Sequence, residues 1–410
     1  MESGHIAWML LSTALVLLMT PGLAFFYGGL VRSKNTLNTM MMSFAALGVI
    51  GITWALVGYS LAFGGAGKWL GGGAHLLLQG VDLQAKGSIP HLLFMAFQGT
   101  FAVITAALIS GAIVGRMRFA PYLAFITLWS LLVYAPLCHW VWGEGGWLAG
   151  LGALDFAGGT VVHINAGVAA LVLALVLGPR SEHGRLAMLA HNVPFVILGS
   201  AMLWFGWFGF NGGSALEANE QGVLAFVNTM LAPMATLVVW MLTDLVRDHR
   251  ANAVGAATAV VVGLVAITPA AGFVSPLSAI LIGAIATFPS YIAIQMKHKW
   301  ALDDSLDVFA GHGLGGIVGA MLTGVFANSA WGGSAMGGFT QVGIQFAAVL
   351  AAAAYSAIAS FALIKLVGAF MALRPQVQEE GLGLDISQHG EEAYSTGEGA
   401  ILILSRKKAG

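Results

Sequence analysis

The feature that most constrains this chain is a series of long apolar stretches, which recur from residue 6 to about residue 371. Of its 410 residues, 58% are hydrophobic and 9% are charged, whereas a soluble domain carries about 25% charged residues. A soluble fold could not hide so much apolar surface, because its exterior would also have to be apolar. The sequence therefore predicts an all-α, polytopic membrane protein.

Charged residues and clusters of Gly, Pro and Asn divide the apolar stretches into eleven segments. A hydrocarbon core of about 30 Å requires about 20 residues of helix. The eleven predicted transmembrane helices are residues 6–28, 37–63, 91–114, 119–139, 158–178, 192–212, 222–243, 253–271, 275–296, 305–327 and 341–371. Residues 1–371 are thus expected to form one transmembrane domain.

The first apolar run is expected to be a true transmembrane helix. Met1–His5 contains no Lys or Arg, and the run is too long for the core of a signal peptide. A further segment that is cleaved from the precursor is the alternative that the sequence leaves open.

Basic residues are distributed unequally between the two sides of the predicted membrane. The segments after predicted helices 1, 3, 5, 7 and 9, together with the C-terminal tail, hold fourteen Lys and Arg residues, and the other side holds only Lys68 and Lys86. Lys365 lies within the last predicted helix. Because basic loops stay in the cytoplasm, we expect the N-terminus outside and the C-terminus in the cytoplasm of a cell-membrane protein.

Residues 372–410 form a polar tail with an acidic middle. The tail is too short for a folded catalytic domain, so it is predicted to be a cytoplasmic regulatory or protein-binding segment. A disordered end without a role is the alternative.

The composition also excludes several classes of function. A net charge of −1 gives no reason to expect nucleic-acid binding. The single cysteine, Cys138, excludes an intrachain disulfide framework and a cysteine-rich metal site. No nucleophile–base set for an enzyme is apparent, and no cofactor is expected.

Two short motifs each place an acid and a histidine at the start of a predicted helix. Asp155 precedes His163 by eight residues, and Asp304 precedes His312 by the same interval. Each carboxylate is predicted to cap its helix by accepting free N–H groups at the positive helix end. Ionisable side chains are costly inside a membrane, so these histidines are functional candidates.

The geometry of the two motifs predicts an inverted repeat. Eight helical residues rise about 12 Å, close to half of a membrane core of about 30 Å. Since the two helices enter from opposite sides, His163 and His312 are expected near the same depth. Predicted helices 1–5 and 6–10 then fit an inverted 5+5 repeat, with helix 11 as an addition.

A lone buried histidine is more often structural, but a matched pair favours a polar line or proton relay along a pore. A metal site needs three or four ligands. Asp155 and Asp304 lie about 12 Å from the histidines along their own helices. No metal is therefore expected.

Aromatic residues cluster near the predicted outer ends of several helices, as Phe97, Phe101, Trp140, Trp142, Trp204, Trp207, Phe208 and Phe210. Packing and the interfacial aromatic belt are the ordinary interpretation for Trp140, Trp147 and Trp204. Aromatic faces also bind cations, with a gain of about 2 kcal/mol or more when desolvated. Ser214 could add a hydrogen-bond acceptor, which favours a weakly hydrated monovalent cation that donates hydrogen bonds.

The order of several motifs resembles the ammonium transporter family (Amt/Mep/Rh), and its prokaryotic Amt branch in particular. The resemblance covers essentially the whole chain and is carried by segments 21–29, 31–35, 97–101, 140–143, 152–165, 207–214, 304–312 and 389–394. The segment Gly152-Ala-Leu-Asp-Phe-Ala-Gly-Gly-Thr-Val-Val-His-Ile-Asn165 is the most specific of them.

The resemblance implies a homotrimer in which each subunit has its own pore. It implies an outer site for the ammonium ion at Trp142, Phe101 and Ser214, with Phe97 and Gln98 beside it. It further implies a pore gate of Phe101 and Phe210, twin histidines at His163 and His312, Trp207 on the pore wall, and Asp155 as a supporting carboxylate. Asp304 is expected to support the second histidine as Asp155 supports the first.

The tail around Asp385–Tyr394 resembles the surface on which a PII-type signalling protein docks. Two features depart from the family pattern. Gly115 replaces a Glu that many relatives have, and the chain ends in Ile401–Leu404 and Ser405–Lys408 beyond the family motif.

The residues and the resemblance together suggest that the protein recruits ammonium, removes its proton and conducts ammonia past the twin histidines, with the proton following. Two alternatives stay open: an electroneutral gas channel of the Rh type, and an ammonium sensor that signals through the tail. A current measurement separates the first from a transporter, and binding without flux would mark the second.

Overall fold

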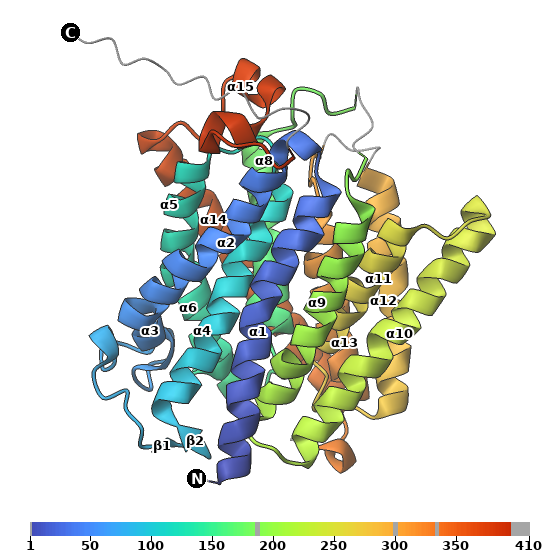
Figure 1. Ribbon diagram of the computed structural model, residues 1–410. Helices are drawn as coiled ribbons and strands as arrows, with labels where there is room; N and C mark the ends of the chain where they lie inside the picture. Colours follow the sequence, from blue (N-terminus) through green and yellow to red (C-terminus); the bar gives the residue numbers. More distant parts are fainter. Residues whose placement is uncertain (1, 185–188, 298–301, 333–335, 395–410) are drawn as a thin grey trace.

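The computed structural model describes residues 2–184, 189–297, 302–332 and 336–394. Its long helices run side by side as one bundle (Figure 1). The α-helices are α1 (Ser3–Leu30), α2 (Thr36–Thr53), α3 (Tyr59–Phe63), α4 (His91–Leu108), α5 (Phe119–Trp129), α6 (Ala135–Trp142), α7 (Trp147–Leu151), α8 (Asn165–Leu177), α9 (Val193–Gly212), α10 (Glu220–Asp248), α11 (Ala253–Ile267), α12 (Pro276–Met296), α13 (Gly315–Phe326), α14 (Phe339–Phe370) and α15 (Val377–Leu382).

Short π-helical and 3₁₀ turns extend or join several of these helices. The π-helical turns are η2 (Trp54–Gly58), η5 (Ser130–Tyr134), η6 (Gly159–Ile164), η9 (Phe309–Leu314) and η11 (Asp385–His389). One antiparallel hairpin, of β1 (Ala85–Lys86) and β2 (Ile89–Pro90), precedes α4, with Ala85 opposite Pro90.

Within the described residues, ten helical segments are long and apolar enough to cross a membrane. They are Ser3–Leu30, Ser33–Phe63, His91–Ala112, Phe119–Leu151, Gly159–Leu177, Val193–Ala215, Glu220–Asp248, Pro276–Met296, Phe309–Phe326 and Phe339–Phe370. This confirms a multi-pass helical membrane protein and matches ten of the eleven predicted segments.

The remaining predicted segment, 253–271, forms a shorter helix than expected. Helix α11 has 15 residues and ends at Ile267, because Pro269 has no backbone N–H with which to continue the helical hydrogen bonds. The chain then turns, and the side-chain amide of Asn228 donates hydrogen bonds to the carbonyls of Ala271 and Val274. The crossing by an eleventh helix stays a prediction.

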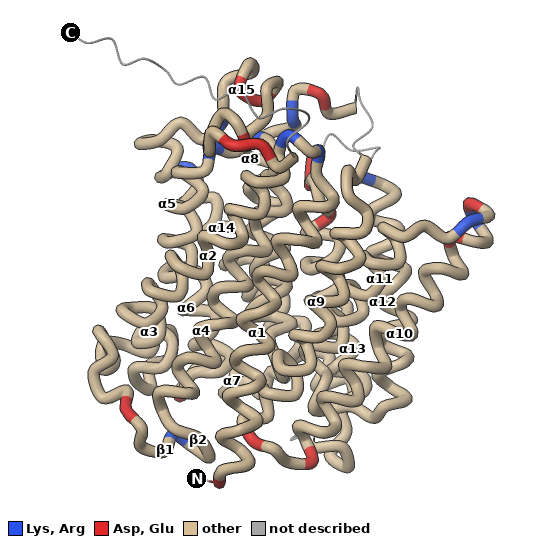
Figure 2. Tube along the Cα trace, in the orientation of Figure 1, with Lys and Arg blue, Asp and Glu red and all other residues tan. Residues whose placement is uncertain are grey.

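Charged residues lie mostly at the two ends of the bundle (Figure 2). The end that carries α15 holds most of the Lys and Arg residues, and we call it the tail face. This distribution has the asymmetry expected from the sequence, and the orientation N-out/C-in stays a prediction. Arg185, Lys299 and the basic residues of 405–408 lie outside the described residues.

The described part of the tail packs onto the tail face. Asp385 Oδ1 accepts a hydrogen bond of 2.8 Å from the backbone N–H of Asn38, and the backbone N–H of Leu384 donates to Asn35 Oδ1. Arg118 donates two hydrogen bonds to Glu379, which fix α15 near the start of α5. The tail is therefore folded as far as Tyr394, and segment 401–408 lies outside the described residues.

The two predicted halves meet through reciprocal contacts. Helix α1 packs along α9, which pairs the first helices of the two halves. Turns η6 and η9 contact each other, while α8 contacts η9 and α13 contacts η6. This pattern supports the predicted inverted repeat and brings the starts of two interrupted helices together in the interior.

Gly167 allows this close crossing. A Cβ at Gly167 would clash with the backbone nitrogen and Cα of Gly313. Helix α8 can approach η9 closely only because residue 167 has no side chain.

We predict that Gly167→Ala lowers the free energy of unfolding by about 1–3 kcal/mol, as overpacking does in dense interiors. Gly343→Ala is the matched control, since a Cβ at this helical position meets no atom within 4 Å. Thermal unfolding of both variants in detergent measures the difference. Equal stability of the two variants would contradict the tight crossing.

Candidate pore and substrate site

A cavity of about 190 Å³ opens near the ends of α4 and α6 that lie away from the tail face, and we call it the vestibule. It is lined by Phe63, Phe94, Gln98, Phe101, Trp142, Phe156, Ser214 and Leu216. Four of the five residues predicted for the outer site line it together, although they come from separate parts of the chain. Phe97 is fully buried behind Phe101, with ring centroids 4.9 Å apart.

Two polar side chains interrupt this aromatic lining. The Ser214 hydroxyl donates a hydrogen bond of 2.8 Å to the carbonyl of Phe210, so its oxygen lone pairs are left to accept hydrogen bonds. Gln98 is 8% exposed, and its buried Oε1 has no hydrogen-bond partner among the described residues. A ligand that donates hydrogen bonds would satisfy such groups.

Phe101 and Phe210 separate the vestibule from the interior. Their rings are stacked, with centroids 4.1 Å apart and planes 24° apart, and both side chains are almost completely buried. Phe101 also meets Trp142 edge-on at 6.0 Å. Phe101 thus lines the vestibule on one side and contacts Phe210, which lines the next cavity, on the other.

The cavity behind Phe210 is narrow and nearly all apolar, and we call it the lumen. Its volume is about 10 Å³, close to the minimum that holds one water-sized molecule. It is lined by Met19, Leu23, Phe26, Ile104, Leu108, His163, Leu203, Trp207, Phe210, Val261 and His312.

The structure brings His163 and His312 together on the lumen wall. Their Nδ1 atoms are 3.2 Å apart, and the rings are nearly parallel. A hydrogen bond between two Nδ1 atoms requires one to carry the proton and the other to present its lone pair. His163 Nε2 has no partner among the described residues, so it is available to a molecule in the lumen.

Trp207 holds one of the two histidines in place. Its ring stacks on His163 with centroids 5.3 Å apart, and its Nε1–H donates to the Thr268 hydroxyl at 2.8 Å. Thr268 in turn donates to the carbonyl of Leu264. Thr268 was not predicted from the sequence, since a threonine in an apolar segment gives no signal of its own.

The two aspartates cap the turns that carry the histidines. Asp155 accepts four hydrogen bonds of 2.6–3.1 Å from the backbone N–H groups of residues 158–161. Asp304 accepts two from Val308 and Phe309. Asp155 also connects to the vestibule, because its carbonyl accepts a hydrogen bond from Trp142 Nε1.

Several vestibule residues were not predicted as site residues. Phe63, Phe94, Phe156 and Leu216 are apolar, and their sequence pattern is that of ordinary core residues. Among the described residues, no group of three or more His, Cys, Asp and Glu side chains is arranged to hold a metal ion.

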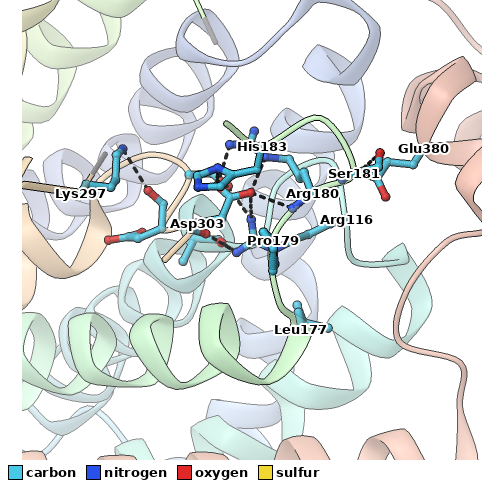
Figure 3. Close-up of polar contacts among 12 residues, drawn as sticks. Arg116, Leu177, Pro179, Arg180, Ser181, His183, Lys297, Asp303 and Glu380 are labelled. Carbon is cyan, nitrogen blue, oxygen red and sulfur yellow. Dashed lines mark hydrogen bonds and ion pairs between the residues drawn. The ribbon is translucent and has the colours of Figure 1, made fainter. Parts of the chain in front are cut away.

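A buried ion cluster lies on the tail face beside Asp304 (Figure 3). Arg180 donates to both oxygens of Asp303, and Arg116 Nη1 lies 2.9 Å from Asp303 Oδ2. Arg116 is 0% exposed and Asp303 is 2% exposed. From the sequence, both arginines were predicted only as markers of orientation.

The same cluster joins the tail to the transmembrane helices. Glu380 accepts hydrogen bonds from Ser181 (Figure 3). It also accepts one from Arg374, which donates to the carbonyls of Leu177 and Pro179 at the end of α8. The backbone of this segment therefore lies between the Asp303 cluster and α15.

Gly115 precedes this cluster and has a backbone conformation that suits glycine. Its φ is +73°, and a Cβ would lie 2.8 Å from Asn35 Nδ2. A larger residue would displace Asn35 and the tail segment that it binds.

Electrostatics determine the charge state of the Asp303 cluster. Burial acts to raise the pKa of Asp303, but hydrogen bonds and charges from Arg180 and Arg116 outweigh it and hold the pKa well below its usual range. Burial lowers the pKa of Arg116 to about 10, so its guanidinium stays charged at neutral pH. Burial also raises the pKa of the neighbouring Asp304 to about 6.

Membrane-length helices around a narrow, mostly apolar interior cavity define this chain as a multi-pass membrane protein. The model of the Ammonium Transporter Family matches residues 7–394. The chain belongs to this family, which confirms the family predicted from its motifs.

Individual relatives agree with this assignment. The protein named "Ammonium transporter" of Bacillus subtilis (strain 168) is 47% identical over 403 residues, which are 96% of this chain and 99% of the relative. The crystal structure of Saccharomyces cerevisiae Mep2 superposes with a TM-score of 0.86 at 36% identity, covering 92% of this chain and 88% of that one. A structure titled "Sensor Amt Protein" gives a TM-score of 0.87 at 30% identity, covering 94% of this chain and 98% of that one.

We predict that Asp303→Asn destabilises the folded protein by about 3–5 kcal/mol, because it leaves two buried guanidinium groups without a counter-charge. Glu182→Gln, which breaks a partly exposed pair with Arg32, should cost at most about 1 kcal/mol. Unfolding in detergent at neutral pH measures both variants.

The stabilisation that Asp303 provides depends on pH. An unfolded Asp has a pKa of about 3.9, so the stabilisation by Asp303 is complete above about pH 4 and is lost as the pH falls through the lower pKa of the folded state. The Asp303 carboxylate therefore stays ionised from about pH 5 to pH 8, and Asp303→Asn should remain less stable than wild type throughout this range. A difference that disappeared in this range would contradict the assignment.

Proposed function

We propose that this chain is an ammonium transporter that recruits the ammonium ion in the vestibule, removes its proton and conducts ammonia through the lumen. The observation that carries the proposal is the order of the groups along one path. Aromatic faces and acceptors come first, the stacked Phe101 and Phe210 follow, and the paired histidines lie behind them. Membership of the Ammonium Transporter Family supports the same function.

Recruitment uses two properties of ammonium. Its charge is attracted to the electron-rich faces of Trp142 and Phe101, a gain of about 2 kcal/mol or more when the ion is desolvated. Its four N–H groups can donate to the oxygens of Gln98 and Ser214, whereas potassium makes no directional hydrogen bonds. The vestibule should therefore prefer ammonium to potassium.

The lumen penalises a charged species. A bare ion would leave water without gaining a counter-charge, which costs several kcal/mol or more in an apolar medium. The Asp155 carboxylate offers little compensation, because four backbone N–H groups already occupy its oxygens. The ion therefore gives up its proton to solvent water on the vestibule side before ammonia passes Phe210.

The paired histidines can form hydrogen bonds with a passing ammonia molecule and can also transfer a proton separately. With one proton shared between the Nδ1 atoms, one ring presents an Nε2 lone pair and the other an Nε2–H. Ammonia can donate to the first and accept from the second. An imidazole can accept a proton on one ring nitrogen and release one from the other, so the same pair can transfer the proton that follows.

We further propose that three subunits assemble and that a PII-type protein docks on the tail face. The described part of the tail supports the docking proposal, because it forms a cavity together with a loop of the tail face. Ser33, Lys34, Asp385, Ile386 and Tyr394 line a cavity of about 330 Å³ between the tail and the first loop of this face. Such a surface combines charged, aromatic and apolar groups.

We predict that His163→Leu and His312→Leu each abolish or alter ammonium transport while the protein stays folded, because the lumen then lacks the hydrogen-bonding pair. Ammonium flux into proteoliposomes, with unfolding temperature as the folding control, measures this outcome. Unchanged flux and ion selectivity in both variants would remove the histidines from the mechanism.

We predict that Trp142→Leu raises the half-saturating ammonium concentration by about 2- to 30-fold, the equivalent of losing about 0.5–2 kcal/mol of cation–π attraction. Trp204→Leu is the control, because Trp204 donates to the carbonyl of Thr229 and does not line the vestibule. If Trp142→Leu kept the wild-type affinity and potassium discrimination, aromatic recruitment would be wrong.

A further inference from the structure

The hairpin of β1 and β2 is hydrogen-bonded to the loop that carries Leu216, a residue of the vestibule lining. It lies at the end of the bundle opposite the tail, next to the start of α4 (Figure 1). Ser88, in its turn, donates a hydrogen bond of 3.0 Å to the carbonyl of Leu216, which lines the vestibule. Ile89 is fully buried and anchors the second strand. The hairpin is therefore fixed against the vestibule wall.

This hairpin places a primary ammonium group against a ring that lines the vestibule. Lys86 Nζ lies 5.3 Å from the ring centroid of Phe94. Phe94 is 8% exposed and lines the vestibule one helical turn before Gln98. An alkylammonium ion of the protein itself thus occupies a cation–π position on a ring that also borders the proposed ammonium site.

The Lys86 charge is not neutralised by a direct partner. The side chain is half-buried and makes no ion pair with any described carboxylate. Burial lowers the pKa of Lys86, while the charge of the exposed Glu144 acts in the opposite direction. Its positive field therefore extends into the vestibule with only partial compensation.

We propose that Lys86 is an affinity-setting residue, whose positive charge weakens the binding of cations in the vestibule and excludes divalent ions. This inference rests on the proposed ammonium site. One unit charge on the ring layer next to the site, in a dielectric between that of water and a protein surface, changes monovalent affinity by about two- to fivefold. A divalent ion experiences twice the repulsion, so its affinity falls by about the square of that factor.

The test uses the full-length protein in proteoliposomes, with ammonium-dependent current measured against ammonium concentration at low and high salt. Lys86→Met should lower the half-saturating ammonium concentration by about two- to fivefold at low salt, with a smaller change in the maximal current. The effect should shrink at high salt, because screening acts on exposed charges. Magnesium should inhibit Lys86→Met more strongly than wild type.

Two control variants separate charge from shape. Lys86→Arg keeps the charge and should behave as wild type. Lys68→Met removes a lysine whose aromatic neighbour, Trp69, does not line the vestibule. Lys68 lies 5.6 Å from the ring centroid of Trp69 and lines a different cavity beside Trp147. This variant should leave the half-saturating concentration unchanged.

The failures of the two proposals can be distinguished. Wild-type current with an unchanged half-saturating concentration in Lys86→Met would overturn the inference and leave the proposed function intact. An equal shift in Lys86→Arg or Lys68→Met would also overturn it, since local charge would not be the cause. No ammonium current from wild type would remove the proposed function, and this inference with it.

Discussion

Inside the bundle, polar groups must find their partners in the protein, because the surrounding hydrocarbon offers none. The interrupted helices satisfy this constraint in a way that also creates the site. Asp155 binds the free N–H groups of η6, and Asp304 binds those of η9. The two capped turns can then begin deep in the protein, which sets His163 and His312 side by side between the two halves.

The same constraint explains the separation between vestibule and lumen. The vestibule contains aromatic faces and free acceptors, so it can hold a charged ion that still donates hydrogen bonds. Beyond the stacked Phe101 and Phe210, the lumen has almost no polar surface apart from the histidine pair. A neutral molecule of the size of water fits this space, and a charged one pays the full cost of desolvation. In the proposed function, selectivity for ammonia over ions comes from the change from a partly polar cavity to an apolar one across the rings of Phe101 and Phe210.

Much of this arrangement could be predicted from the sequence, because hydrophobic length and repeated polar motifs are local signals. The apolar runs predicted the membrane helices, and the shared Asp-to-His interval predicted that His163 and His312 lie near the same depth in the membrane. Helix α11 ends early, at Ile267, because of Pro269 and of hydrogen bonds from the distant Asn228. The length of the apolar segment 253–271 therefore did not predict where this helix ends. The burial of Arg116 with Asp303, and the positions of Phe94 and Thr268, depend on tertiary packing that no local pattern encodes.

The most direct test is the current from reconstituted wild-type protein on a solid-supported membrane after a jump in ammonium concentration, with a potassium jump as control. The account predicts a saturable current that scales with protein density for ammonium and is absent for potassium. Rapid internal alkalinisation without current would contradict proton transfer by the histidine pair and indicate a neutral ammonia channel. Ammonium binding without current or alkalinisation would contradict transport altogether and indicate a sensor.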